Sequence, residues 1–300
     1  RHTRSRAPLS LQCETTAQRP QTSSGRTDSN RDRRTTPSGH PRTRAVGGAG
    51  TVSAMTAVFV HGVPETTRVW EPLVSHLERE DVVLLGLPAF GSPRPEGFDA
   101  TMETYAAWLA EELRAFDQVD LVSHDWGGLL TLRVLADRPA NVRSWVSDMG
   151  DLDPTFEWHD TARTWQTPGD GEALMEVFLG ATLEDRAAIL EGVSAPQPGA
   201  TVMAEHLDRT MADAILDLYR SATDIGNDWG PGIDRIAAPG LLVQSMNDPF
   251  RNPNRVQALA DRTDAEIATL DDAGHFWMLD DPEGAAQLIT DFWESVPARG

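Results

Sequence analysis

The sequence predicts an α/β protein built on a parallel β-sheet of about six strands, with helices on both faces. Two observations predict this class. Short apolar runs alternate with stretches of helical periodicity along most of the chain, as they do where parallel strands are joined by helices. Between the fourth and fifth apolar runs, residues 152–228 show helical patterns and no strand pattern, which indicates a helical insertion into the sheet.

The expected strands are short apolar runs bounded by turn residues or by a helical pattern, at 57–60, 81–85, 119–122, 142–146, 241–243 and 266–270. The helices expected around them have apolar residues at helical spacing, over 101–116, 129–135, 256–260 and 285–293. Within the insertion, helical patterns cover 173–179, 183–190 and 203–218. Because ligands bind outside the carboxyl ends of parallel strands, an insertion at that edge predicts a helical cap over a buried pocket.

Composition separates the start of the chain from the remainder. The protein has 300 residues and a net charge of −20, and all 26 of its basic residues are arginine. Residues 1–50 nevertheless hold ten arginines, three acids and few large apolar side chains. Such a segment buries too little surface to offset its ordering entropy, so we expect 1–54 to be a disordered basic tail. An Arg- and Ser-rich transit segment is the alternative, and Met55 is the expected functional start.

The expected domains are therefore a core formed by 55–151 with 229–300, and a cap at 152–228. No run of 18 apolar residues is present, so no membrane-spanning helix is expected. The negative net charge of the chain after the tail argues against nucleic-acid binding by that part. Cys13 is the one cysteine, which excludes a disulfide framework or a cysteine-based metal site within the chain. We expect a cytoplasmic monomer or homodimer that needs no metal or cofactor.

Residues 121–128 join an expected strand to an expected helix through a sharp turn. Asp125 stands where the G-x-Nuc-x-G elbow carries its nucleophile, with Ser123 at the first glycine position. A carboxylate that attacks a saturated carbon leaves an alkyl ester, which water can hydrolyse, whereas serine would leave an ether. Asp125 is therefore predicted to displace a leaving group at an sp³ carbon. The alternative is that Asp125 only caps the helix that follows.

Ser-His-Asp-Trp-Gly-Gly at 123–128 and His-Gly-Val-Pro at 61–64 resemble the G-H-D-W-G-G and H-G-x-P motifs of one branch of the α/β-hydrolase superfamily. That branch, the epoxide hydrolases and haloalkane dehalogenases, uses an aspartate nucleophile, and the resemblance spans residues 56–296. It implies an α/β-hydrolase fold and an oxyanion hole formed by the backbone N–H groups of Val63 and Trp126.

The resemblance also assigns the remaining catalytic groups. Gly-His-Phe at 274–276 resembles the segment that carries the family's general base, so His275 is expected to activate water. Asp248 follows the penultimate strand, where the family places the acid that orients this histidine. Some dehalogenases place the acid one strand earlier, where Asp148 and Asp151 are the candidates.

The leaving group separates the two activities. An epoxide opens to an alkoxide that needs a proton, which tyrosines supply in epoxide hydrolases, whereas a halide needs only N–H donors. The segment that ends in Tyr219 resembles the one that carries one such tyrosine. The second tyrosine is expected near Thr161 and is absent, with His159 or Trp165 as a substitute. For a halide, Trp126 could donate together with Trp158 or Trp165.

The sequence thus predicts a cofactor-free hydrolase of small apolar epoxides. A haloalkane dehalogenase is the alternative, and a non-catalytic ligand-binding protein on the same scaffold is the third reading. The expected pocket residues are His61, Pro64, Trp158, His159 and Trp165.

Overall fold

The computed structural model describes residues 55–297, and the predicted tail at 1–54 lies outside them. Six strands form one parallel sheet in the order β2-β1-β3-β4-β5-β6, which confirms the predicted fold class. The strands are β1 (Met55–Val60), β2 (Val82–Leu85), β3 (Gln118–Ser123), β4 (Val142–Ser147), β5 (Gly240–Ser245) and β6 (Glu266–Leu270). Within 55–297, no helix has the length and apolar character needed to cross a membrane.

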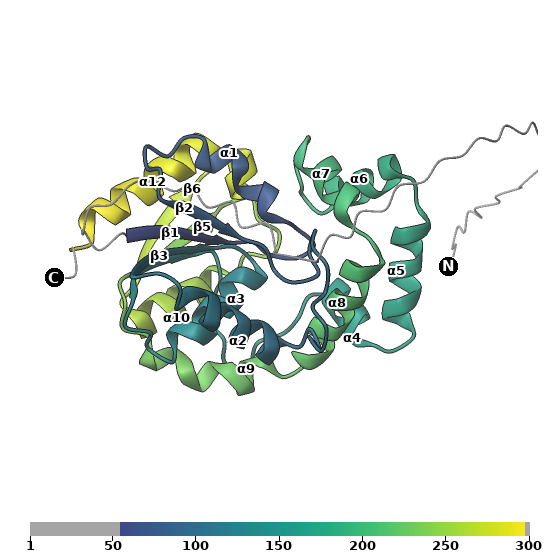
Figure 1. The fold of residues 1–300 in the computed structure, drawn as a ribbon, viewed down its shortest axis with the longest axis horizontal. Coiled ribbons are helices and arrows are strands. Elements are labelled where there is room, and N and C mark those ends of the chain that lie inside the picture. Colours follow the sequence, from purple (N-terminus) through teal and green to yellow (C-terminus); the bar gives the residue numbers. More distant parts are fainter. Residues whose placement is uncertain (1–54, 298–300) are drawn as a thin grey trace, which may run out of the picture. The chain divides into compact units, whose positions relative to one another are not determined.

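Alternate side chains of β1 enter two different cores because successive residues of a strand face opposite sides of the sheet. Val58 and Val60 lie in one core, and Ala57 and Phe59 lie in the other. The helices on the first side are α2 (Met102–Leu113), α3 (Trp126–Leu135) and α10 (Pro253–Thr263). Those on the second side are α1 (Glu71–Val74), α11 (Trp277–Asp280) and α12 (Pro282–Ser295). Figure 1 shows α2, α3 and α10 on one face of the sheet and α1 and α12 on the other.

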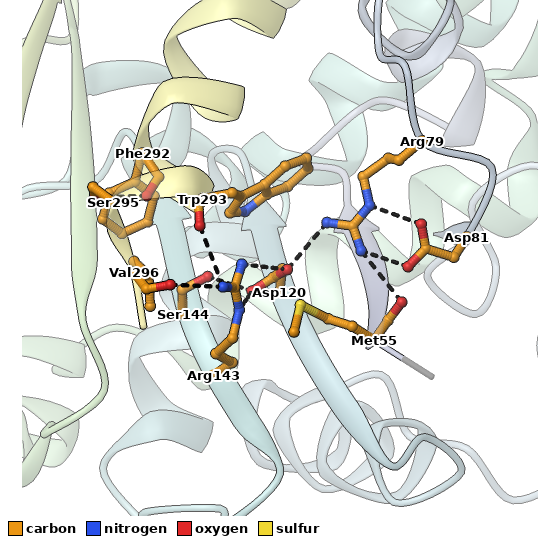
Figure 2. Close-up of polar contacts among 10 residues, drawn as sticks. All are labelled: Met55, Arg79, Asp81, Asp120, Arg143, Ser144, Phe292, Trp293, Ser295 and Val296. Atoms are coloured by element: carbon orange, nitrogen blue, oxygen red, sulfur yellow. Dashed lines mark hydrogen bonds and ion pairs between the residues drawn. The ribbon is translucent and has the colours of Figure 1, made fainter. Parts of the chain in front are cut away.

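A buried ion cluster fastens the amino ends of β3 and β4 (Figure 2). The fully buried Asp120 carboxylate accepts hydrogen bonds from Arg143 Nε at 2.7 Å and Nη2 at 2.9 Å, from Arg79 Nη1 at 3.0 Å and from Ser144 Oγ at 2.6 Å. Arg143 also donates to the carbonyl oxygens of Trp293 and Val296, at 3.2 Å and 3.0 Å. The cluster therefore joins the last helix to the sheet, at the end remote from the turn that carries Asp125.

The register of the parallel strands brings the carboxyl ends of β1 and β3 side by side. Val60 and Ser123 are paired residues, and the backbone N–H of His124 donates to Val60 O at 3.1 Å. The turns that follow these two strands, which carry His61 and Asp125, consequently start next to each other.

Helices fill the chain between β4 and β5. They are α4 (Asp160–Gln166), α5 (Asp170–Gly180), α6 (Leu183–Gly192), α7 (Gly199–His206), α8 (Arg209–Ser221) and α9 (Ile225–Trp229), followed by the 3₁₀ helix η2 (Gly230–Arg235); the further 3₁₀ helix η1 (Thr67–Trp70) follows β1. The prediction of a single helix over 203–218 is wrong, since the helix is interrupted at Leu207 and Asp208. The Asp208 carboxylate caps the new helix by accepting from Met211 N at 2.9 Å, which stabilises a separate start for α8.

Candidate active site

Asp125 lies at a strained turn between β3 and α3. Its φ of +47° and ψ of −122° are unusual for a residue with a side chain, and such backbone strain is concentrated at functional sites. The turn requires close approach of two segments, because a Cβ on Gly127 would lie 2.3 Å from Val60 O and one on Gly62 would lie 2.4 Å from Asp125 Cβ. The Asp125 side chain does not cap α3, so the helix-capping alternative is wrong.

Two backbone N–H groups point at the Asp125 carboxylate. Val63 N donates to Asp125 Oδ1 at 2.9 Å. Burial raises the pKa of Asp125, while the positive charges of His275 and His124 and a hydrogen bond from Trp126 N lower it. The backbone N–H groups of Val63 and Trp126, which are predicted to form an oxyanion hole, therefore both contact the Asp125 carboxylate.

His275 and Asp248 come together from the loops that follow β6 and β5. His275 Nδ1 lies 3.1 Å from Asp248 Oδ2, and Phe250 N donates to Asp248 Oδ1 at 2.7 Å. Burial disfavours the charged imidazole, but the hydrogen bond and charge of Asp248 outweigh it and raise the pKa of His275. With Nδ1–H directed at Asp248, Nε2 is left to accept a proton. Asp151, an alternative acid, is instead paired with Arg262 at 2.7 Å.

Asp148, the other alternative acid, lies next to Asp125 and holds its backbone N–H. Asp148 Oδ1 accepts from Asp125 N at 3.1 Å, and Oδ2 accepts from Trp277 Nε1 at 2.8 Å and contacts His124 Nδ1. Glu65 Oε1 lies 3.0 Å from the other ring nitrogen of His124, although the N–H is not aligned for a hydrogen bond. We call Glu65, His124 and Asp148 the support cluster.

The support cluster is ionised. Burial alone would lower the pKa of His124, but the adjacent Glu65 and Asp148 carboxylates raise it well above its usual value. Burial would likewise raise the pKa of each carboxyl group, yet the charge of His124 lowers both. Glu65 Oε2 also accepts from Gly62 N at 3.1 Å, so the cluster holds the backbone of both the turn after β1 and the turn that carries Asp125.

Tyr219 projects from α8 to the same site. It is buried, and its ring contacts Trp126 and Trp165 with centroids 5.3 Å and 4.8 Å apart. Burial, and then the negative charge of Asp125, raise the pKa of the Tyr219 hydroxyl well above its usual value, while the nearby Trp126 indole opposes the rise. Tyr219 therefore keeps its proton and can donate it or a hydrogen bond.

His159 lies at the amino end of α4, where its Nδ1 accepts from Ala162 N at 3.3 Å. Burial lowers the pKa of His159, and the charge of His275 acts in the same direction. A neutral ring that accepts at Nδ1 carries its proton on Nε2, so His159 offers one N–H donor. The centroid of its ring lies 4.9 Å from that of Phe250, whose own centroid lies 5.0 Å from that of His275, so a single ring separates His159 from His275.

The tryptophans differ in what their indole N–H groups do. Trp158 Nε1 donates to Ala222 O at 2.8 Å, so this predicted donor is already engaged. The indole nitrogen of Trp165 is buried and has no aligned partner among residues 55–297. That of Trp126 is also buried and lacks a well-aligned partner there, although it lies close enough to the Tyr219 hydroxyl to lower its pKa.

A cavity of about 470 Å³ joins these groups. Of the residues predicted for the site, it is lined by Asp125, His275, Asp248, Tyr219, Val63, Pro64, Trp158, His159 and Trp165. The lining combines loops after the strands with helices of the insertion, and most of it is apolar. No cluster of His, Cys, Asp and Glu suited to a metal occurs in 55–297.

His61, also predicted for the pocket, is not part of its wall. Its side chain is fully buried behind the turn, with Nε2 accepting from Leu87 N at 3.1 Å and Nδ1 2.8 Å from Gly62 O. Both ring nitrogens have partners, and burial lowers the pKa of the ring. His61 therefore connects the loops that follow β1 and β2.

A sequence model described as the alpha/beta hydrolase family matches residues 57–288. The chain belongs to the alpha/beta hydrolase family. Among curated alpha/beta hydrolase relatives, a haloalkane dehalogenase of Psychrobacter cryohalolentis is 24% identical, with 80% of this chain and 84% of the relative covered. A pimeloyl-[acyl-carrier protein] methyl ester esterase of Aromatoleum aromaticum is 26% identical over 78% of this chain and 96% of the relative.

Solved structures agree on the fold. Haloalkane dehalogenase DbeA of Bradyrhizobium elkani superposes with a TM-score of 0.63 at 22% identity, covering 82% of this chain and 93% of the other. At this identity the likeness establishes the alpha/beta hydrolase fold, and the reaction must be argued from the site itself.

The support cluster is what sequence reasoning missed. The sequence predicts Asp148 only as an alternative acid for His275, places His124 in the motif at 123–128, and assigns no catalytic role to Glu65. A signal was present, since three ionisable residues stand in or next to the turns that end β1, β3 and β4. Adjacent strand ends in a parallel sheet meet at one edge, which would bring those residues together.

Proposed function

We propose that this alpha/beta hydrolase is a cofactor-free epoxide hydrolase that acts on small, largely apolar epoxides through an ester on Asp125. The observation that carries the proposal is that Asp125 at the elbow shares one cavity with His275, with Val63 of the predicted oxyanion hole and with two separate donors for a leaving oxygen. The donors are the Tyr219 hydroxyl and the His159 Nε2–H.

In the first step, Asp125 attacks a ring carbon of the epoxide. Because Oδ1 is held by Val63 N, Oδ2 is the attacking atom. The new C–O bond forms to Oδ2 while the ring C–O bond breaks and leaves its electron pair on the epoxide oxygen. That oxygen takes a hydrogen bond from His159 and a proton from Tyr219, which removes the charge that makes an alkoxide a poor leaving group.

In the second step, His275 Nε2 accepts a proton from water, and the hydroxide attacks the ester carbonyl carbon. The resulting oxyanion is on Oδ1, where the Val63 and Trp126 N–H groups stabilise it. The bond from that carbon to Oδ2 then breaks, and the diol leaves with Oδ2 and a proton from His275. Asp125 is left as a carboxylic acid that contains one oxygen from water, and its proton returns to the Tyr219 phenolate, which restores both groups. Asp248 stabilises the imidazolium that exists between the two proton transfers.

Substitution of the donors tests this assignment with styrene oxide as substrate. Tyr219→Phe and His159→Phe should each lower the rate of ester formation by about 10²-fold or more, the usual contribution of a positioned acid. Tyr105→Phe is the matched control, because the Tyr105 hydroxyl donates to Pro88 O at 2.7 Å and the residue does not line the cavity. Equal rates in Tyr219→Phe and Tyr105→Phe would remove Tyr219 from the reaction.

A haloalkane dehalogenase is the second candidate, and the Trp165 indole N–H, which has no aligned partner within 55–297 and belongs to a residue of the cavity wall, favours it. A departing halide needs hydrogen-bond donors and no proton. The comparison substrate is 1-bromobutane, with bromide release as the readout. Bromide release that depends on Trp165 and persists in Tyr219→Phe, without turnover of styrene oxide, would select the dehalogenase.

A further inference from the structure

The cavity carries a positive charge that the proposed reaction does not use. Three arginines line it, and two of them are paired with acids. Arg163 Nη2 lies 3.2 Å from Asp160, and Arg255 Nη1 lies 3.3 Å from Asp153. The half-buried Arg251 guanidinium has no hydrogen-bond or ion-pair partner in the described part of the chain.

Arg251 is held next to the catalytic machinery by its backbone. It stands three residues after Asp248, and its N–H donates to Asp248 O at 3.2 Å. The intervening Phe250 contacts the rings of both His159 and His275. The guanidinium therefore borders the same cavity on a loop whose position the proposed acid fixes.

Carboxylates inside the cavity do not supply the missing partner. Asp248 is paired with His275, and Asp148 is paired with His124. Glu157, which also lines the cavity, lies 4.0 Å from Arg163. Asp125 is held by backbone N–H groups at the base of the site. The charge of Arg251 is thus left for a molecule that enters the cavity. A guanidinium matches a carboxylate through two parallel hydrogen bonds, which makes this anion its favoured partner.

We propose that Arg251 is a specificity-determining residue that binds a carboxylate on the substrate, so that the preferred substrates are apolar epoxides with a carboxylic acid at the end remote from the ring. This proposal deepens the proposed function and rests on it for the reactive group. The binding of the anion itself does not depend on the reaction. The apolar walls would hold the hydrocarbon between the carboxylate at Arg251 and the ring at Asp125.

The first experiment measures binding without chemistry. Decanoate and decanamide have the same chain and nearly the same head-group shape, and they differ in charge. Calorimetric titration of the intact protein should show decanoate binding about tenfold more tightly, as expected for hydrogen bonds to a charged partner. The preference should vanish in Arg251→Gln and return in part in Arg251→Lys, while Arg163→Gln, the matched control whose arginine is already paired, should keep it.

The second experiment measures turnover of ω-epoxy carboxylic acids of increasing chain length and of their methyl esters. At the best length, the acid should have a KM about tenfold below that of the ester, and Arg251→Gln should raise only the KM of the acid, with kcat unchanged. Turnover of both with equal KM would overturn the Arg251 proposal and leave the epoxide hydrolase intact. Tight, Arg251-dependent binding of decanoate without turnover of either epoxide would support the anion site and overturn the proposed reaction. Equal binding of decanoate and decanamide would overturn the anion site.

Discussion

Replacement of Asp148 by Asn tests whether the support cluster holds the turn that carries Asp125. The change keeps the size of the side chain and removes its charge. Asp148 accepts three hydrogen bonds, from Asp125 N and Trp277 Nε1 and from the ring of His124. An amide has one acceptor oxygen, so its NH₂ group must face at least one of these donors in either orientation.

The size of the effect follows from burial. The Asp148 side chain is 7% exposed and that of His124 is fully buried, so water cannot replace the lost partner. Removing one member of a buried ion pair costs about 3–5 kcal/mol because the other charge stays buried. Glu65 still faces His124, which favours the lower part of that range. In a domain of this size, each kcal/mol lowers the melting temperature by about 2–4 °C, so a fall of roughly 6–20 °C is expected.

Urea denaturation and thermal melting of Asp148→Asn measure this directly. Asp234→Asn is the matched control, because Asp234 makes an ion pair with Arg262 while its side chain is 70% exposed. Exposed pairs contribute little, so the control should unfold with the parent protein. If Asp148→Asn lost no more stability than Asp234→Asn, the support cluster would not be the buried ionic anchor that its geometry indicates.

Three further predictions follow from the charges. In the proposed reaction, ester hydrolysis needs neutral His275, so the single-turnover rate of ester hydrolysis should fall as the pH drops through the raised pKa of His275. Asp248→Asn should move that fall to lower pH. A profile that does not move would contradict the pairing of Asp248 with His275. The stabilisation by protonated His124 should be complete below pH 6.5, the ordinary pKa of histidine, and should disappear as the pH rises through the raised pKa of His124. The stabilisation by ionised Glu65 should be complete above pH 4.5, the ordinary pKa of glutamate, and should disappear as the pH falls through the lowered pKa of Glu65. Urea denaturation across this pH range would show a stability maximum, and a monotonic trend would count against it. Asp120→Asn should cost about 3–5 kcal/mol of stability with kcat unchanged, since its ion cluster lies at the other end of the sheet; a loss of kcat in the folded variant would contradict that separation.

The fold was predictable because its strands are short apolar runs separated by clear turn residues. The break between α7 and α8 was not, because residues 203–218 keep helical periodicity across it. A local interaction separates the two helices, because the Asp208 side chain caps the start of α8. Periodicity reports which face is buried, and it does not report where a capping group competes with the continuing helix.

The candidate site was predictable where a residue type and a turn coincide, as at Asp125 and His275. The fate of individual hydrogen-bonding groups was not. The sequence predicts Trp158 and Trp165 as alternative N–H donors without distinguishing them. In the structure, Trp158 Nε1 donates to Ala222 O, whereas Trp165 Nε1 has no aligned partner in 55–297. The sequence likewise does not show that the Arg251 guanidinium has no partner within 55–297, because this depends on how the neighbouring loops fold. Such differences follow from tertiary contacts between residues far apart in the chain.

The central claim is that Asp125 forms a covalent ester that water then attacks at the carboxyl carbon. Single-turnover reaction of excess enzyme with styrene oxide in H₂¹⁸O tests it most directly. Because the diol leaves with Asp125 Oδ2, the first diol should be unlabelled and the heavy oxygen should appear in the peptide that contains Asp125. Label in the diol from the first turnover, with none in that peptide, would mean that water attacks the epoxide itself and would contradict the account.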